Sequence, residues 1–300
     1  MVDSLLQSQN LPGVARGENP TEPSNEHGKT GEILRKPEYP DNLGLITDLL
    51  LHAETGIVES KDGYLVVRTP ESPDYFFGNM LILPQRPSGS ELQRLGDDFA
   101  RLVGIPPRIA HRTFAWDDTE GGVADLDAFI ECGYEATVCR VLAARPNDIR
   151  PVATNASVEV RRFESLADWD DWARMQLADM SQPLDGASLS YVAYQQAAYR
   201  NLLARGLGDW WGAFIDGEQA ASLGLFFLDG VGRFQSIVTR EQDRNKRVCR
   251  TLVSQVIGLT ADRSDQLVMV ADEAYHAGKI YEALGFEPQG RIGSLCLEPR

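Results

Sequence analysis

One stretch decides how this chain is interpreted: Ser236-Ile-Val-Thr-Arg-Glu-Gln-Asp-Arg-Asn-Lys-Arg-Val-Cys-Arg-Thr-Leu-Val253. It begins with β-branched residues typical of a strand, passes through a charged turn and then places apolar residues at helical spacing. The turn and the first helical residues carry four cations, Arg244, Lys246, Arg247 and Arg250. Free backbone N–H groups and the helix dipole favour anions at a helix N-terminus. The stretch therefore predicts an anion site, most naturally for phosphate; a solvated basic loop is the alternative.

Composition bounds the class of protein. The chain has 300 residues, enough for two domains, and its content of 43% hydrophobic and 24% charged residues is ordinary for a globular protein. A formal net charge of −15 argues against non-specific nucleic-acid binding and against an anionic membrane surface. No apolar run approaches the roughly 18 residues of a membrane span. The acidity suits cationic ligands such as amines, although it also serves solubility.

The cysteines and histidines give no metal signature. The four cysteines have no metal-ligand spacing and do not cluster with the four histidines, so no metal is expected. A reducing, cytoplasmic compartment is the default for such a chain. The N-terminus also lacks the apolar core of a signal peptide.

The first 146 residues are expected to form a tail and one domain. Residues 1–40 are rich in Gly, Pro, Asn, Ser and Glu and predict a disordered tail. Residues 41–146 are predicted to contain, in order, a helix over 43–51, a hairpin over 56–68, a strand over 75–83, a helix over 88–103 with Ser90 as its N-cap, a strand over 108–116, a short helix over 125–132 and a strand over 134–144.

A linker is expected near residues 147–156, followed by a second domain over 155–300. Its predicted elements are a strand over 158–163, helices over 165–180 and 188–206, strands over 210–215, 220–228 and 232–238, a helix ending near 261, a strand over 266–270, a helix over 275–284 and a strand over 288–297. The three consecutive strands predict an antiparallel meander. The strands before and after the basic turn and its helix are expected to be parallel neighbours.

This order of elements, with two motifs, resembles the GCN5-related N-acetyltransferase (GNAT) family. The family's acyl-CoA motif R/Q-x-x-G-x-G/A is similar to Arg244-Asn-Lys-Arg247-Val-Cys249. The family's A-x-x-x-Y-x-x-x-G-F ending resembles Ala277 to Phe286, with Tyr281 and Gly285 on its key positions.

The resemblance covers residues 155–297 firmly and 45–145 weakly, because Phe129-Ile-Glu-Cys-Gly-Tyr134 echoes Tyr281 to Phe286. It implies an α/β (α+β) fold with two GNAT-like domains, each a mixed, mostly antiparallel central sheet flanked by helices. The N-terminal domain, 41–146, is expected to be the degenerate one, because no arginine-rich turn precedes its Phe129 to Tyr134 segment.

Two positions depart from the family pattern. Arg247 stands where family members carry glycine, whose missing Cβ lets the backbone approach a pyrophosphate. Ala274 stands where the family often carries asparagine. Arg247 either replaces or weakens the usual phosphate grip.

The resemblance also implies roles for individual residues. Backbone groups of Ile237, Val238 and Thr239 would hold pantetheine and the acyl carbonyl; an ordinary core strand is the alternative. Tyr281 would protonate the coenzyme A thiolate, unless it is a packed helix aromatic. Arg244, Asn245, Lys246, Arg247, Val248 and Cys249 would form the pyrophosphate loop. Cys249 has no matched histidine and is interpreted as a small packed residue rather than a nucleophile.

The residues do not identify a general base. Glu241, Asp243, Asp272 and Glu273 lie near the expected cleft, and each is interpreted as a solvated carboxylate. Asp185 and Tyr191 fall where family members often shape the acceptor pocket. Trp169 and Trp172 are expected in the core, and the adjacent Trp210 and Trp211 must point to opposite faces of a strand.

The resemblance implies an N-acetyltransferase that moves an acetyl group from acetyl-CoA to a primary amine by direct attack in a ternary complex. Acetyl-CoA would be a co-substrate, and the acceptor a small-molecule amine or an amine on a protein, with no nucleic acid and no membrane as partner. The alternative is a non-catalytic acyl-CoA-binding or regulatory module on a tandem GNAT scaffold, prompted by Arg247 and Ala274. The oligomeric state is left open.

Overall fold

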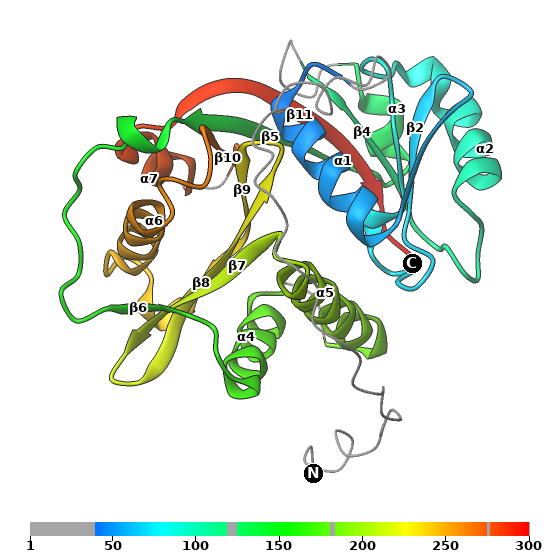
Figure 1. Ribbon diagram of the computed structural model, residues 1–300. Coiled ribbons are helices and arrows are strands. Elements are labelled where there is room, and N and C mark those ends of the chain that lie inside the picture. Colours follow the sequence, from blue (N-terminus) through cyan, green and yellow to red (C-terminus); the bar gives the residue numbers. More distant parts are fainter. Residues whose placement is uncertain (1–39, 119–124, 181–183, 275–276, 300) are drawn as a thin grey trace, which may run out of the picture. The chain divides into compact units, whose positions relative to one another are not determined.

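A computed structural model describes residues 40–118, 125–180, 184–274 and 277–299 (Figure 1). The predicted disordered tail falls, except for residue 40, outside these described residues. The described residues belong to one compact unit. No helix among them is both long enough and apolar enough to cross a membrane.

The N-terminal half begins with one helix and continues with strands and two further helices. Its elements are α1 (Leu43–Thr55), β1 (Ile57–Lys61), β2 (Tyr64–Arg68), β3 (Met80–Ile82), α2 (Leu92–Leu102), β4 (Arg112–Asp117), α3 (Asp127–Glu131) and β5 (Glu135–Ala144). Asn42 caps α1 by accepting hydrogen bonds from the backbone of the first turn. Asp62 and Gly63 both have positive φ, which fits the tight turn predicted for the β1–β2 hairpin.

The C-terminal half has the order of elements predicted from the sequence. Its elements are β6 (Glu159–Arg162), α4 (Leu166–Asp179), α5 (Gly186–Ala204), β7 (Gly208–Ile215), β8 (Glu218–Leu228), β9 (Val231–Thr239), α6 (Val248–Leu259), β10 (Gln266–Asp272), α7 (Ala277–Leu284) and β11 (Glu287–Leu297). The predicted antiparallel meander is confirmed in β7, β8 and β9. The parallel pairing predicted across the basic turn and its helix is confirmed between β9 and β10.

All the strands form one mostly antiparallel sheet with the order β1-β2-β3-β4-β11-β5-β10-β9-β8-β7-β6. The last strand of each half pairs with the other half: β11 lies between β4 and β5, and β5 lies between β11 and β10. This exchange of strands makes the sheet continuous across the linker (Figure 1). The expected mixed α/β fold with a mostly antiparallel sheet is therefore confirmed, whereas its division into domains over 41–146 and 155–300 stays a prediction.

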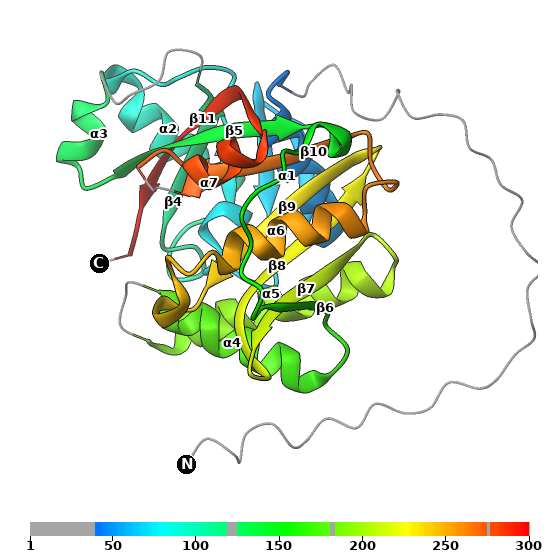
Figure 2. The same cartoon turned by 90° about the vertical axis from the view of Figure 1, so that its left-hand side faces the viewer.

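Helices cover both faces of the sheet. On one face, α6 and α7 pack against the apolar side chains of β8, β9 and β10, and α2 and α3 pack against β2, β3 and β4. Figure 2 shows α6 and α7 in front of these C-terminal strands. On the other face, α1 packs on β5, β10 and β11, while α4 and α5 pack on β7 and β8 around a cluster of tryptophans. As predicted, Trp210 and Trp211 point into different cores.

Two local predictions were wrong. The segment 75–83 is mostly not a strand, because Phe76–Gly78 forms a 3-10 turn and only Met80–Ile82 pairs with its neighbours. The helix predicted over 88–103 begins with a 3-10 turn, Gly89–Glu91, which Ser88 caps instead of Ser90 and which leads into α2. Ser88 and Glu91 form a capping box, in which each side chain bonds the other residue's backbone.

Helix α1 meets the sheet through a glycine, and this contact gives the first prediction. A Cβ on Gly44 would lie 2.6 Å from Cγ2 of the buried Val141 and 2.9 Å from Cδ1 of Ile292. Gly44→Ala should therefore lower the free energy of unfolding by about 1–3 kcal/mol, as overpacking does in well-packed cores. Urea denaturation of the purified protein measures this difference.

Gly258 in α6 provides the matched control, because a Cβ there would meet nothing within 4 Å. Gly258→Ala should raise the free energy of unfolding by about 0.5–1 kcal/mol, since it removes a flexible residue from a helix. Equal effects of the two substitutions would contradict the close packing of α1 on β5 and β11.

Candidate functional site

The site begins where β9 and β10 separate. The two strands pair only through Val231–Arg233 and Gln266–Val268, so the second half of β9 has no partner on that side. Parallel strands that diverge leave backbone N–H and C=O groups unpaired along the gap. The gap can therefore accept an extended ligand that supplies the missing hydrogen bonds.

A bulge in β9 changes which face its side chains point to. Gly224 pairs with Gln235 and Ser222 pairs with Val238, so β9 contains one residue more than β8 between these pairs. The extra residue accommodates Ser236, whose φ of 45° lies in the left-handed region. As a result, Gln235 points to the face covered by α5, whereas Ile237 points to the face covered by α6.

The basic loop, residues 240–247, connects β9 to α6 and ends in a left-handed residue. Arg247 precedes α6 with φ 63° and ψ 15°, a conformation that favours glycine. The motif position that carries glycine in the family thus has a glycine-like backbone here despite its side chain. The linker holds this loop: Asn155 donates to the Lys246 carbonyl oxygen at 3.0 Å, and its own N–H donates to Thr251 Oγ1 at 2.8 Å.

A cavity of about 360 Å³, here called the loop cavity, lies between β9, the basic loop, α6 and α7. It brings together most of the residues that the sequence analysis singled out. Its lining residues are Ile237, Thr239, Asp243, Arg244, Asn245, Arg247, Val248, Cys249, Arg250, Ile280 and Tyr281. Val238 is buried and Lys246 is exposed, and neither lines the cavity.

Two of the four cations that were expected to bind an anion form ion pairs within the protein instead. Arg244 forms an ion pair with Asp179 at the end of α4 and donates to the Thr239 carbonyl oxygen at 3.2 Å. Lys246 lies 3.3 Å from Asp243. Arg247 and Arg250 line the cavity and have no ion-pair partner among the described residues. These two cations, at the start of α6, therefore suit an anionic ligand such as a pyrophosphate.

Asp243 corrects one expectation of the sequence analysis. It is 5% exposed, not solvated, and it binds Arg240 Nε at 2.6 Å. Burial alone would raise the pKa of Asp243, but the hydrogen bonds from Arg240 and Lys246 outweigh burial and hold the pKa below its ordinary value. The carboxylate thus organises the loop and is not placed to act as a base.

The other expected carboxylates also have local partners. Glu273 pairs with Arg140 at 3.2 Å and Arg291 at 3.3 Å, and Asp272 accepts from the Ala274 N–H. Asp185 is the N-cap of α5, where it accepts from the Ser188 N–H at 2.8 Å. Glu241 is exposed in the basic loop.

Cys249 and Tyr281 form part of the cavity wall. Burial raises the pKa of the Cys249 thiol to about 11, against weaker opposing effects of Thr239 and Arg250. The thiol is therefore protonated at neutral pH, which makes it a poor nucleophile. Tyr281 is 5% exposed and belongs to the core beneath α6 and α7 while one side of it faces the cavity. Its position allows both a packing role and contact with a ligand.

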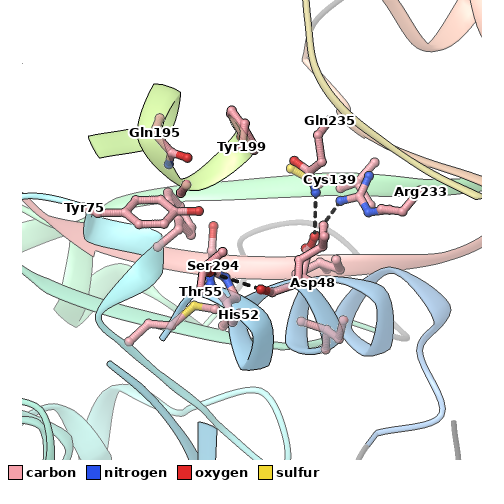
Figure 3. A pocket seen from close by; sticks show the side chains of 18 of the residues that line it. Asp48, His52, Thr55, Tyr75, Cys139, Gln195, Tyr199, Arg233, Gln235 and Ser294 are labelled. Carbon is pink, nitrogen blue, oxygen red and sulfur yellow. Dashed lines mark hydrogen bonds and ion pairs between the residues drawn. The ribbon is translucent and has the colours of Figure 1, made fainter. Parts of the chain in front are cut away.

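A second cavity of about 380 Å³, here called the central cavity, lies on the opposite face of β9. The sequence analysis did not find it. Figure 3 shows Asp48 and His52 reaching it from α1, with Gln195 and Tyr199 on the opposite side from α5. Val270 of β10 lines it together with Gln235 of β9, so this cavity also adjoins the point where the two strands separate. Each face of the gap thus has its own cavity.

One ion pair dominates the polar lining of the central cavity. Arg233 Nη2 lies 2.7 Å from Asp48 Oδ1, and Gln235 Nε2 donates to the same oxygen at 3.4 Å (Figure 3). The Arg233 side chain is 6% exposed. Tyr199 bonds Ser236 of the bulge through an O···O contact of 3.2 Å. The bulge is therefore fixed from the central cavity.

The spacing of Asp48 and His52 was the available signal for this cavity. The two residues are four positions apart in a mostly apolar helix, so they share one face and interrupt it with polar groups. Tyr191, expected near an acceptor pocket, instead packs on Tyr75 with ring centroids 5.5 Å apart and does not line the cavity.

The N-terminal half lacks the corresponding gap. Its parallel strands β3 and β4 stay paired at the C-terminal end of β3, where Leu83 N donates to the Ala115 carbonyl oxygen at 2.8 Å. At the turn before α2, Glu91 accepts from the Ser88 N–H at 2.9 Å, which places a carboxylate where an anion would bind. Within the described residues, the open gap with a basic loop is found between β9 and β10.

Comparison with solved structures identifies the fold. A GCN5-related N-acetyltransferase from Kribbella flavida has a TM-score of 0.54 and 15% identity, over 83% of this chain and 92% of that chain. The chain has the fold of the GCN5-related N-acetyltransferases.

A second GNAT, from Sphaerobacter thermophilus, has a TM-score of 0.50 and 17% identity over 70% of this chain and 67% of that one. A conserved protein of unknown function from Staphylococcus epidermidis has a TM-score of 0.67 and 13% identity, over 82% of this chain and 95% of that one. No protein-family model matches the chain, and no curated protein matches its sequence.

Among the described residues, no group of three or more His, Cys, Asp or Glu side chains is arranged to hold a metal ion. The residues at the start of α6 instead fit a phosphate group.

Two substitutions at Arg247 distinguish the role of its side chain from that of its left-handed backbone. Arg247→Gly and Arg247→Ala both remove the guanidinium, but only glycine relieves the left-handed backbone. We expect the free energy of unfolding of the glycine variant to be about 1 kcal/mol higher than that of the alanine variant. Both should bind acetyl-CoA, the co-substrate that the resemblance implies, about tenfold more weakly than the unaltered protein. Denaturant titration and calorimetry measure these quantities.

If the glycine variant bound acetyl-CoA more tightly than the unaltered protein, the Arg247 side chain would be an obstruction to the phosphate and not a ligand. The next residue, Val248, is 1% exposed, so a substitution there would disturb the core and could not serve as a control. Arg174→Ala, at an exposed arginine on α4 outside the loop cavity, controls for the loss of one surface charge.

Proposed function

We propose that this protein transfers an acetyl group from acetyl-CoA to a primary amine, by direct attack within a ternary complex. One observation carries the proposal: the gap between β9 and β10 has a cavity with unpaired cations on one face and a second, largely apolar cavity on the other. A phosphate-bearing thioester could enter from the first cavity and an amine from the second. The two reactants would then meet at the bulge in β9.

The residues of the loop cavity suit the binding of coenzyme A. Arg247, Arg250 and the backbone N–H groups at the start of α6 would hold the pyrophosphate. The edge of β9 that faces the gap, Ile237 to Thr239, would bind the pantetheine arm as an added strand, which fixes the thioester in line; the Thr239 carbonyl oxygen is already bonded by Arg244. The roles assigned to Arg244 and Lys246 become structural in this proposal, because their charges are already paired.

The reaction needs few chemical groups. The lone pair of the amine nitrogen attacks the acetyl carbonyl carbon and forms the C–N bond. The C–S bond then breaks, and its electron pair leaves with sulfur. Tyr281, at the wall of the loop cavity, would give its phenolic proton to the thiolate, and the amine would lose a proton to a base. The products are an N-substituted acetamide and coenzyme A with a free thiol.

Two observations count against the non-catalytic alternative. It arose because Arg247 replaces the glycine of the motif, but the backbone of Arg247 already has the left-handed conformation that glycine favours. The central cavity adds a second reason to favour catalysis, since an acyl-CoA-binding module has no need of a space for an acceptor.

Tyr281→Phe tests the assigned proton donor. The variant should lower kcat at neutral pH at least tenfold, because it removes one proton-transfer group, and it should bind acetyl-CoA with unchanged affinity. Thiol release with a panel of primary amines measures kcat, and calorimetry measures the affinity. Tyr134→Phe, at a tyrosine 4% exposed in the N-terminal half, is the matched control and should leave both unchanged.

An unchanged kcat in Tyr281→Phe would remove this tyrosine from the mechanism. Absence of acetyl-CoA binding in the unaltered protein, together with absence of thiol release for every amine, would overturn the proposed function itself.

A further inference from the structure

The central cavity has the size and lining of a small-molecule site. Its volume of about 380 Å³ falls within the usual range for ligand clefts. Most of its lining is apolar or aromatic, including Met80, Val270 and Ile292 from three different strands, Tyr75 from the turn before β3 and Tyr194 from α5. A ligand with an apolar body would therefore gain more from this lining than a strongly hydrated one.

The charged groups of the cavity cancel one another. Asp48 is its carboxylate and Arg233 its guanidinium, and they are joined by the 2.7 Å ion pair. A dication such as a polyamine would find no free carboxylate among the described lining residues. The lining therefore favours an amine that carries a single nitrogen on an apolar body.

Several titratable groups that line the cavity have pKa values shifted toward their neutral forms. Burial is the largest cause in each case: it raises the pKa of Cys139 to about 12 and raises the pKa values of Tyr75 and Tyr199. Burial also lowers the pKa of His52, opposed by Asp48 and assisted by Arg233. An amine that entered would be pushed in the same direction, toward the neutral form that has a nucleophilic lone pair.

His52 is the residue in the cavity best suited to accept a proton. It is 8% exposed, lines the cavity from α1, and packs beside Tyr75 with ring centroids 5.8 Å apart. Among the described residues, no hydrogen bond to a side chain or backbone occupies its ring nitrogens. Asp48 is already bonded to Arg233 and Gln235, so it is less free to act as the base.

Resting on the proposed acetyl transfer, we propose that the central cavity binds the acceptor, a small primary amine with an apolar body, and that His52 accepts the proton which its nitrogen loses. The C–N bond forms at the acetyl carbon as the C–S bond breaks, one proton passes from the attacking nitrogen to the imidazole, and the sulfur takes its proton from the other face. The N-terminal half thereby supplies the base for a site whose thioester is held by the C-terminal half.

Blocking the cavity tests where the acceptor binds. Ala198 lines the cavity from α5, while the adjacent Ala197 is exposed on the same helix and does not line it. With 2-phenylethylamine as acceptor, Ala198→Phe should raise KM at least tenfold and leave the affinity for acetyl-CoA unchanged. Ala197→Phe should change neither. Direct calorimetric titration of 2-phenylethylamine, without acetyl-CoA, should show binding that Ala198→Phe removes.

Equal KM values for the two phenylalanine variants, in a protein that does release thiol, would overturn the acceptor site while leaving the proposed acetyl transfer intact. The substrate class has its own test. The value of kcat/KM for 2-phenylethylamine should exceed that for spermidine at least tenfold, and the opposite order would overturn the class.

His52→Gln tests the base. It should lower kcat at neutral pH at least tenfold while the melting temperature and the affinity for acetyl-CoA stay near those of the unaltered protein. His111→Gln is the matched control: His111 is 2% exposed in the N-terminal half and lies outside the cavity. It should keep kcat within twofold.

The pH profile separates a base from a packing residue. The titratable and charged groups that line the cavity together with His52 are Asp48 on its own helix, Arg233, Cys139, Tyr75, Tyr194 and Tyr199. A general base must be neutral, and the pKa of His52 is lowered from its ordinary value of 6.5. As the solution is made more acidic, kcat of the unaltered protein should therefore stay high at pH 6.5 and fall only when the pH drops through the lowered pKa. This fall should vanish in His52→Gln. A variant with the same kcat and the same profile as His111→Gln would exclude His52 as the base.

Discussion

The separation of β9 from β10 is the constraint on which the rest of the site depends. The pairing of these two parallel strands ends at Arg233 and Val268, before the bulge at Ser236, and the edge of β9 beyond that point needs a new partner. The same bulge sends Gln235 to one face and Ile237 to the other. The end of the pairing opens the gap, and the extra residue in β9 lets this strand contribute side chains to both of the cavities that flank it.

The exchange of strands explains why both halves are needed. Because β5 pairs with β10, and β11 with β4 and β5, helix α1 of the N-terminal half lies on strands that come from both halves. The ion pair between Asp48 on α1 and Arg233 on β9 joins the halves at the wall of the central cavity. Among its described residues the N-terminal half has no such gap, yet it completes the acceptor side of the proposed site.

Much of the fold could be predicted from the sequence, because its signals are local. The meander, the parallel pair of strands and α6 follow from alternation, tight turns and helical spacing near residues 208–259. The exchange of β5 and β11 could not be predicted, since strand partners far apart in the chain leave no local signal. The loop cavity was predictable because its residues lie mostly within one stretch, 237–250. The central cavity was not, because Asp48, Gln195 and Arg233 come from three elements far apart in the sequence. The left-handed backbone at Arg247 was also hidden, because arginine rarely adopts it.

The central claim is that the gap between β9 and β10 receives the thioester from the side of α6. The most direct measurement is a crystallographic difference map of the protein soaked with acetyl-CoA. We predict density for the pyrophosphate at the start of α6 beside Arg247 and Arg250, and for pantetheine along the edge of β9 that faces the gap, from Ile237 to Thr239. Fully occupied acetyl-CoA bound elsewhere on the protein, with the gap empty, would contradict this account.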